Sequence, residues 1–81
     1  MLYLIDKPLA GLGFRAASDD PDARVVLLQD GVLLDPDLDV PTFAVQRDAA
    51  VRGIDLPEAV EPVSYDRLVE LVFDHEVASF V

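Results

Sequence analysis

The chain has 81 residues, a formal net charge of −10 and no cysteine or tryptophan, and 52% of its residues are hydrophobic. The length predicts one domain over residues 1–81, and the apolar fraction excludes an intrinsically disordered polyanion. The lack of cysteine excludes disulfides, thiolate zinc sites and a persulfide carrier, and no apolar run is long enough to suggest a membrane span or a signal peptide.

The charge consists of 12 Asp and 4 Glu against 5 Arg and a single lysine, Lys7. A nucleic-acid reader needs the opposite sign, so we expect no direct binding of nucleic acid. Excess acid with almost no lysine favours a halophilic, salt-adapted protein that stays hydrated in concentrated salt. An ordinary acidic protein and a DNA-mimicking inhibitor are the alternatives.

The first part of the chain predicts a strand, a helix and a second strand. Residues 2–5 and 24–29 are continuous apolar runs, which are typical of parallel strands covered on both faces. Between them, Leu9, Leu12 and Ala16 follow the i, i+3, i+7 spacing of a helix face.

The middle of the chain predicts a third strand at residues 42–45, which a loop connects directly to the second strand. A short helix follows at residues 47–52, with Asp48 and Arg52 paired at i, i+4. Gly53 is its expected C-terminal stop.

The last part predicts an edge strand and a long helix. Residues 60–63 belong at a sheet edge because Pro62 lacks an amide donor. Ser64 is a natural N-cap, and Asp66 places negative charge in the first helical turn. The expected buried stripe of this helix comprises Leu68, Val69, Val72, Phe73 and, more loosely, Phe80.

The order of these elements is β-α-β-β-α-β-α. Strands that alternate with helices through short links form right-handed crossovers. The sequence therefore predicts a small α/β fold with a mostly parallel four-stranded sheet and helices on its faces.

Two polar features could carry chemistry, and each has a simpler interpretation. His75 is the only histidine, so it cannot form a structural zinc site alone, and we interpret it as a surface or interface residue rather than a proton-transfer group. An alternation of aspartates resembles a calcium loop but lacks its glycine and closing glutamate, which predicts a solvated loop; these residues are Asp35, Asp37 and Asp39.

Two glycine motifs follow predicted strands. The pair Gly11 and Gly13 lacks the third glycine of a dinucleotide fingerprint, so we expect close helix–sheet packing there and no cofactor. Gln29, Asp30 and Gly31 stand at the carboxyl end of the second strand, where open α/β sheets place their sites. The simpler alternative is a tight turn, in which Gly31 supplies an unusual backbone conformation and Asp30 bonds its own turn.

Taken together, these blocks resemble the TusB/DsrH family of the DsrE/DsrF/DsrH-like fold. The resemblance extends from end to end, and residues 26–32, Val-Leu-Leu-Gln-Asp-Gly-Val, are the family's most recognisable stretch. The other similar segments are the opening Met-Leu-Tyr-Leu-Ile-Asp-Lys-Pro of residues 1–8, residues 43–46, residues 48–54 with their Arg-Gly-Ile end, and residues 64–69 with His75 further on.

The resemblance implies a cytoplasmic sulfur-relay subunit that assembles with DsrE-like and DsrF-like paralogues as a hetero-oligomer. Such sulfurtransferase complexes pass persulfide sulfur toward 2-thiouridine at the tRNA wobble position, in tRNA thiolation, or toward dissimilatory sulfur oxidation. The sulfur-carrying cysteine lies mainly on the DsrE-type partner. This chain departs from the family in lacking cysteine and in a shortened segment after Asp-Gly-Val, residues 33–39.

These observations predict a non-catalytic subunit, structural or regulatory, and not an enzyme. The expected motif and interface residues are Gln29, Asp30 and Gly31, with Tyr65 and Phe80 as aromatic anchors. No catalytic, cofactor-binding or metal-binding residue is predicted. The alternative is a stand-alone interaction or regulatory module outside any sulfur relay. A third hypothesis is an enzyme that acts through Asp30 and His75.

Overall fold

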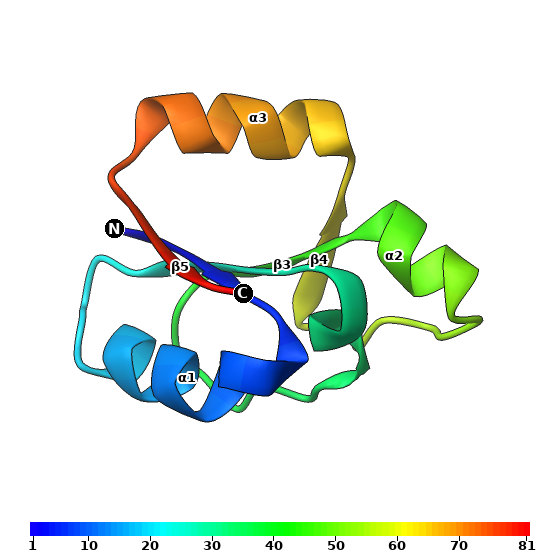
Figure 1. Ribbon diagram of the computed structural model, residues 1–81, viewed down its shortest axis with the longest axis horizontal. Helices are drawn as coiled ribbons and strands as arrows, with labels where there is room; N and C mark the ends of the chain where they lie inside the picture. The colour runs from blue at the N-terminus through cyan, green and yellow to red at the C-terminus, as the bar shows by residue number, and fades with distance from the viewer.

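The computed structural model describes residues 1–81, which build one five-stranded sheet with helices on both faces (Figure 1). All strand pairs are parallel, and the strand order is β4-β3-β2-β1-β5. The elements are β1 (Leu2–Ile5), a 3₁₀ helix (Lys7–Leu9), α1 (Ala10–Ser18), β2 (Arg24–Leu27), a second 3₁₀ helix (Gln29–Leu33), β3 (Thr42–Val45), α2 (Gln46–Val51), β4 (Val60–Val63), α3 (Tyr65–Asp74) and β5 (Val77–Phe80). The α/β class is confirmed.

The prediction of four strands is wrong, because the end of the chain forms a fifth. The last helix ends at Asp74, and the segment expected to continue it as far as Phe80 pairs with β1 instead. The amides of Leu2 and Asp6 donate to the carbonyls of Glu76 and Phe80 at 2.7 and 3.0 Å. Strand β1 would otherwise be an edge with unpaired backbone groups, and β5 satisfies them.

The chain builds the sheet outward from β1 to β4, and α3 then carries it back across one face to β5 (Figure 1). Both sheet faces are apolar, as parallel strands require. The larger cluster lies on the side of α1 and includes Tyr3, Ile5 and Val25. The smaller one lies under α3 and contains Leu2, Val26, Val45, Leu68 and Leu71.

Helix α1 packs on small residues rather than on its leucines. Its buried positions are Ala10, Gly13 and Ala17, whereas Leu9 and Leu12 are exposed, so the expected face is wrong. A Cβ at Gly13 would lie 2.9 Å from the Ile5 side chain, which confirms the close packing expected there. Gly11 has open space around it, and that part of the expectation is wrong.

The predicted stripe of α3 is only partly correct. The Ser64 hydroxyl accepts a hydrogen bond from the Arg67 amide at 3.1 Å, which confirms the N-cap. Leu68 is buried, but Val69 and Phe73 are 52% and 84% exposed, and Val72 is exposed as well. One helix covers only part of a five-stranded face, so only the side that carries Leu68 and Leu71 meets the sheet.

Two further expectations are confirmed. Gly53 follows α2 with a φ of 65°, the left-handed conformation of a helix stop. Strand β4, with Pro62, lies at a sheet edge. No helix is both long enough and apolar enough to cross a bilayer.

Candidate functional site

The Gln29–Asp30–Gly31 motif leaves the carboxyl end of β2 through an unusual backbone turn. Gln29 has a φ of 51°, a left-handed conformation that residues other than glycine rarely adopt. Gly31 lies against the end of β1, where an added Cβ would approach the Ile5 carbonyl oxygen to 2.3 Å. The alternative of a tight exit is therefore correct in outline, but the unusual conformation belongs to Gln29, and Gly31 is required for close approach.

Asp48 links this turn to two other elements. Its carboxylate accepts a hydrogen bond from the Gln29 amide at 2.7 Å, and the Tyr65 hydroxyl lies 2.9 and 3.0 Å from its two oxygens. The residue is only 8% exposed, on the first turn of α2. Bonds to a charged acceptor are stronger than neutral ones, so Asp48 ties the exit of β2 and the start of α3 to α2.

An ion pair completes this group of residues. The Arg52 Nε donates to Asp30 Oδ1 at 2.9 Å, and the Arg52 Nη1 donates to the main-chain carbonyl of Asp48 at 3.1 Å. The expected side-chain pair between Asp48 and Arg52 is therefore wrong. The Asp48 carboxylate is occupied by the Gln29 amide and the Tyr65 hydroxyl, which leaves the guanidinium to Asp30. Asp30 thus does not bond its own turn.

We call Gln29, Asp30, Asp48, Arg52 and Tyr65 the carboxyl-end cluster. Its outer members are accessible, with Tyr65 43% exposed, whereas Asp48 is buried beneath them. The hydrogen bond to the Asp48 carboxylate, together with burial and the negative charge, raises the pKa of Tyr65 above 10.0. The phenol consequently stays protonated and keeps donating at neutral pH.

The structure unites four of the five predicted site residues and separates the fifth. Gln29, Asp30 and Gly31 lie together with Tyr65 through Asp48, although Tyr65 is far away in sequence. Phe80 is half-buried on the α1 face, where its ring stacks on Tyr3 with centroids 6.2 Å apart.

Sequence reasoning missed the central role of Asp48. Its spacing from Arg52 suggested a surface pair, and no local pattern signals a bond to an amide 19 residues earlier. The one available signal was its position in the first turn after a predicted strand, where the carboxyl ends of parallel strands converge.

His75 lies at the opposite end of the sheet from Asp30. It precedes β5, whose first residue Val77 is aligned with the start of β1, whereas Asp30 follows the end of β2. A four-residue strand spans about 13 Å, so the structure does not bring the two residues together as a joint acid–base pair. The Nδ1 of His75 is 2.8 Å from the Leu71 carbonyl oxygen, an acceptor, and therefore donates to it.

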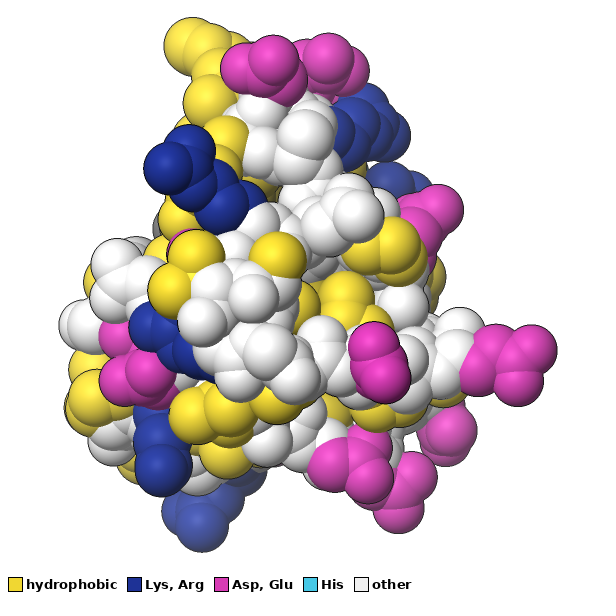
Figure 2. Space-filling model, turned by 90° about the vertical axis from the view of Figure 1, so that its right-hand side faces the viewer, with side chains coloured by type: hydrophobic (Ala, Val, Ile, Leu, Met, Phe, Trp, Pro, Cys, Tyr) yellow, Lys and Arg dark blue, Asp and Glu magenta, His cyan; other side chains and the backbone are white.

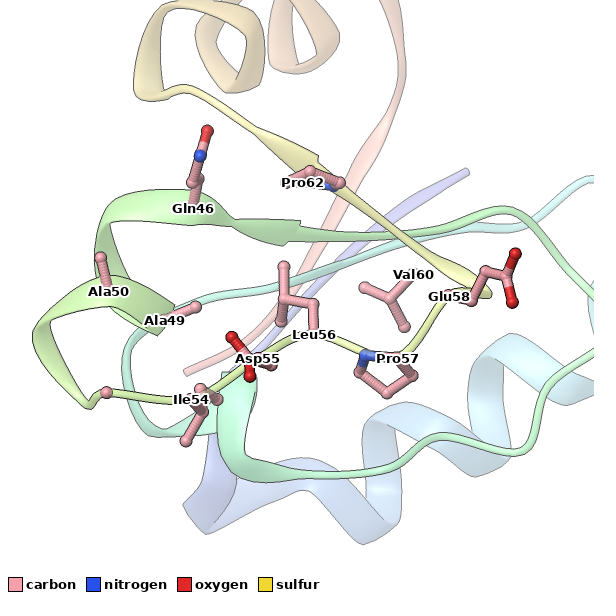
Figure 3. Close-up of a pocket in the computed structure, with 11 residues that line it drawn as sticks. Gln46, Ala49, Ala50, Ile54, Asp55, Leu56, Pro57, Glu58, Val60 and Pro62 are labelled. Atoms are coloured by element: carbon pink, nitrogen blue, oxygen red, sulfur yellow. The ribbon is translucent and has the colours of Figure 1, made fainter.

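The largest hollow in the surface is a groove of about 720 Å³ between α2 and β4 (Figure 3). Its apolar lining includes Ile54 and Leu56, and its polar side chains are Gln46, Asp55 and Glu58. In Figure 3 these polar groups point in different directions rather than toward one point. The groove therefore has no convergent set of groups for catalysis or for an oriented ligand.

The carboxyl-end cluster combines several kinds of polar group on one accessible surface. No group of three or more His, Asp or Glu side chains is placed to hold a metal ion, and no buried side-chain polar atom lacks a partner. The cluster offers a carboxylate, a guanidinium, an amide and a phenol to a docking molecule. Comparison with protein families, curated proteins and solved structures gave no match to this chain.

Proposed function

We propose that this chain is a non-catalytic subunit of a cytoplasmic sulfur-relay complex, with the DsrE/DsrF/DsrH-like fold. The observation that carries the proposal is that Asp48 joins Gln29 to Tyr65, while Arg52 ties Asp30 to the same group. These residues belong to the segments that resemble TusB/DsrH. Residues that share one accessible cluster although they lie apart in sequence are what a common docking role requires.

The rigidity of the cluster supports a docking role. Two hydrogen bonds to Asp48 and one ion pair to Asp30 hold the exposed groups in place before a partner arrives. A preorganised surface loses less side-chain freedom on binding than a flexible one. Tyr65 is the natural anchor, because tyrosine offers large contact area with a polar tip.

In this proposal a partner carries the sulfur. A persulfide forms on a thiolate, and this chain has no cysteine. In the proposed complex, a DsrE-like paralogue carries the sulfur, a DsrF-like paralogue completes the assembly, and this subunit helps to position the partner's cysteine. With a net charge of −10, it would leave any contact with the tRNA to those partners.

The test is affinity purification of the tagged chain from its native cells in high salt. The expected result is co-recovery of a DsrE-like protein, with radiolabelled persulfide sulfur on that partner. Tyr65→Ala should reduce recovery of the partner by on the order of tenfold, a typical loss for an aromatic anchor.

Phe73→Ala, the matched removal of an exposed aromatic ring from the other end of α3, should leave that recovery unchanged. Recovery of the chain without any cysteine-bearing partner would refute the proposal and favour a stand-alone interaction module. Equal recovery with Tyr65→Ala and the unmodified chain would refute the assigned surface.

A further inference from the structure

The two edges of the sheet differ in how they are protected. Strand β4 carries Glu61 and Pro62, and a charge and a proline are common protections against strand pairing. Strand β5 has the sequence Val77-Ala78-Ser79-Phe80, with neither. The side chains of β5 therefore do not protect this edge against strand pairing.

The backbone of β5 has free hydrogen-bonding groups on its outer side. The carbonyls of Glu76 and Phe80 accept bonds from β1, so the even-numbered residues face β1. In a parallel ladder the intervening residues face the other way. The amides and carbonyls of Val77 and Ser79 therefore point outward, where no strand of this chain lies.

Apolar side chains flank this edge on both faces of the sheet. Val72 and Phe73 lie in the last turn of α3, and two residues separate the end of that helix from β5; Phe73 is 84% exposed. Figure 2 shows hydrophobic side chains gathered along one side of α3 at the top of the molecule, with charged side chains on its other side. On the other face, Leu12 is exposed on α1, next to the Gly13 that packs on Phe80.

We propose that a second copy of this chain pairs with β5 in antiparallel orientation, which joins two five-stranded sheets into one of ten strands. The outward groups of Ser79 would bond those of Ser79 in the second copy, on the two-fold axis. Val77 of each copy would then pair with Val81 of the other. Phe73 and Leu12 would pack across the two faces of the junction.

The two-fold symmetry that this edge permits favours a second copy as the occupant. Outward groups on alternate residues around Ser79 are self-complementary, as an isologous contact requires. Because Glu61 and Pro62 hinder strand pairing at β4, the opposite edge, the assembly stops at two copies and does not extend into a fibre.

Charge permits the same contact despite the net charge of −10. Residues 77–81 carry no charged side chain, and antiparallel pairing places Glu76 of one copy at the same end of the junction as Asp6 and Lys7 of the other. The paired strands themselves thus bring no charged side chains together at the centre of the contact. The inference does not depend on the proposed function, because it concerns a different edge of the sheet.

The experiment measures the mass of the purified recombinant chain in solution, by light scattering and sedimentation, in molar KCl. The expected result is a dimer. Val77→Lys places a charge on the edge and should weaken the dimer by about tenfold or more. Val51→Lys makes the same change at an exposed position on α2 and should leave the dimer intact.

A cysteine cross-link tests the register, because the chain has no other cysteine. Opposed residues in a hydrogen-bonded antiparallel pair have Cα atoms about 5.5 Å apart, within reach of a disulfide. Ser79→Cys should form a covalent dimer on mild oxidation, and Ser18→Cys, exposed on α1, should not. A monomer at every concentration, or equal cross-linking by both variants, would overturn the proposal, whatever the outcome for sulfur-relay partners.

Discussion

Replacing Gly31 with alanine should destabilise the fold strongly, because of one close backbone approach. The new Cβ would lie 2.3 Å from the Ile5 carbonyl oxygen and 3.2 Å from Asp6 Cα. Carbon–oxygen contacts are ordinarily no closer than about 3.3 Å, so the turn after β2 would have to move by about 1 Å. The obstacle is backbone, which cannot rotate away as a side chain can.

That movement breaks a specific hydrogen bond. The Ile5 carbonyl accepts from the Leu28 amide at 3.2 Å, and this bond closes the junction between β1 and β2. Unpaired buried backbone groups cost about 1–3 kcal/mol, and overpacking costs a similar amount. We expect Gly31→Ala to lose about 3 kcal/mol of unfolding free energy, which lowers the unfolding temperature by on the order of 15 °C in a domain of this size.

The assay is urea unfolding followed by circular dichroism, with Gly11→Ala as the matched control. Gly11 lies in α1 with nothing within 4 Å of its added Cβ, so the same substitution should stabilise by about 0.5–1 kcal/mol through helix propensity. A Gly31→Ala protein within about 0.5 kcal/mol of the unmodified chain would refute the packing argument.

Three further predictions concern the polar groups and the charge. In a double-mutant cycle followed by urea unfolding, Asp48→Asn and Tyr65→Phe should each lower the unfolding free energy of the protein by about 1 kcal/mol. Because the two side chains share one hydrogen bond, their coupling energy should be about 0.5 kcal/mol or more, and independent effects would contradict that bond. The pKa of Tyr65 is raised by its bond to Asp48, and that of Tyr3 by burial and its bond to Asp20; the folded state thus holds both protons more tightly. The stabilisation of the folded state that these raised pKa values provide is complete below the ordinary pKa of 10.0 and is lost as the pH rises through the pKa values of the folded state. A tyrosinate absorbance titration should therefore have its midpoint above 10.0. A midpoint at or below 10.0 would contradict both bonds. The unfolding temperature should rise between dilute buffer and molar KCl, because the screening length falls to about 3 Å in a molecule 31 Å long; no rise would refute salt adaptation.

Local patterns were sufficient for the elements whose signals are local. The apolar runs predicted β1 to β4, because strands covered on both faces need apolar side chains at every position. Ser64 and Gly53 marked helix ends through their own side chain and backbone. The polar run at the carboxyl end of β2 could also be located, since it follows an apolar strand directly.

The helix faces show where local patterns fail. Leu12 and Phe73 fit helical spacing but are exposed, since the spacing gives the relative positions of apolar residues and not the side on which the sheet lies. Small residues such as Gly13 and Ala17 form the real contact of α1, because they let the backbone come close. In α1 the buried face is therefore the less hydrophobic face of the helix.

By itself, the sequence determined the α/β class, four of the five strands, the acidic charge and the lack of any thiol. The tertiary structure alone decided that residues 77–80 form a strand, because the free edge of β1 offers backbone partners that no local pattern reveals. It also decided that Asp48 joins Gln29 to Tyr65, since chain segments far apart meet only when the parallel strands align their carboxyl ends. Local chemistry selects the elements, and the pairing of distant backbone groups selects which of them meet.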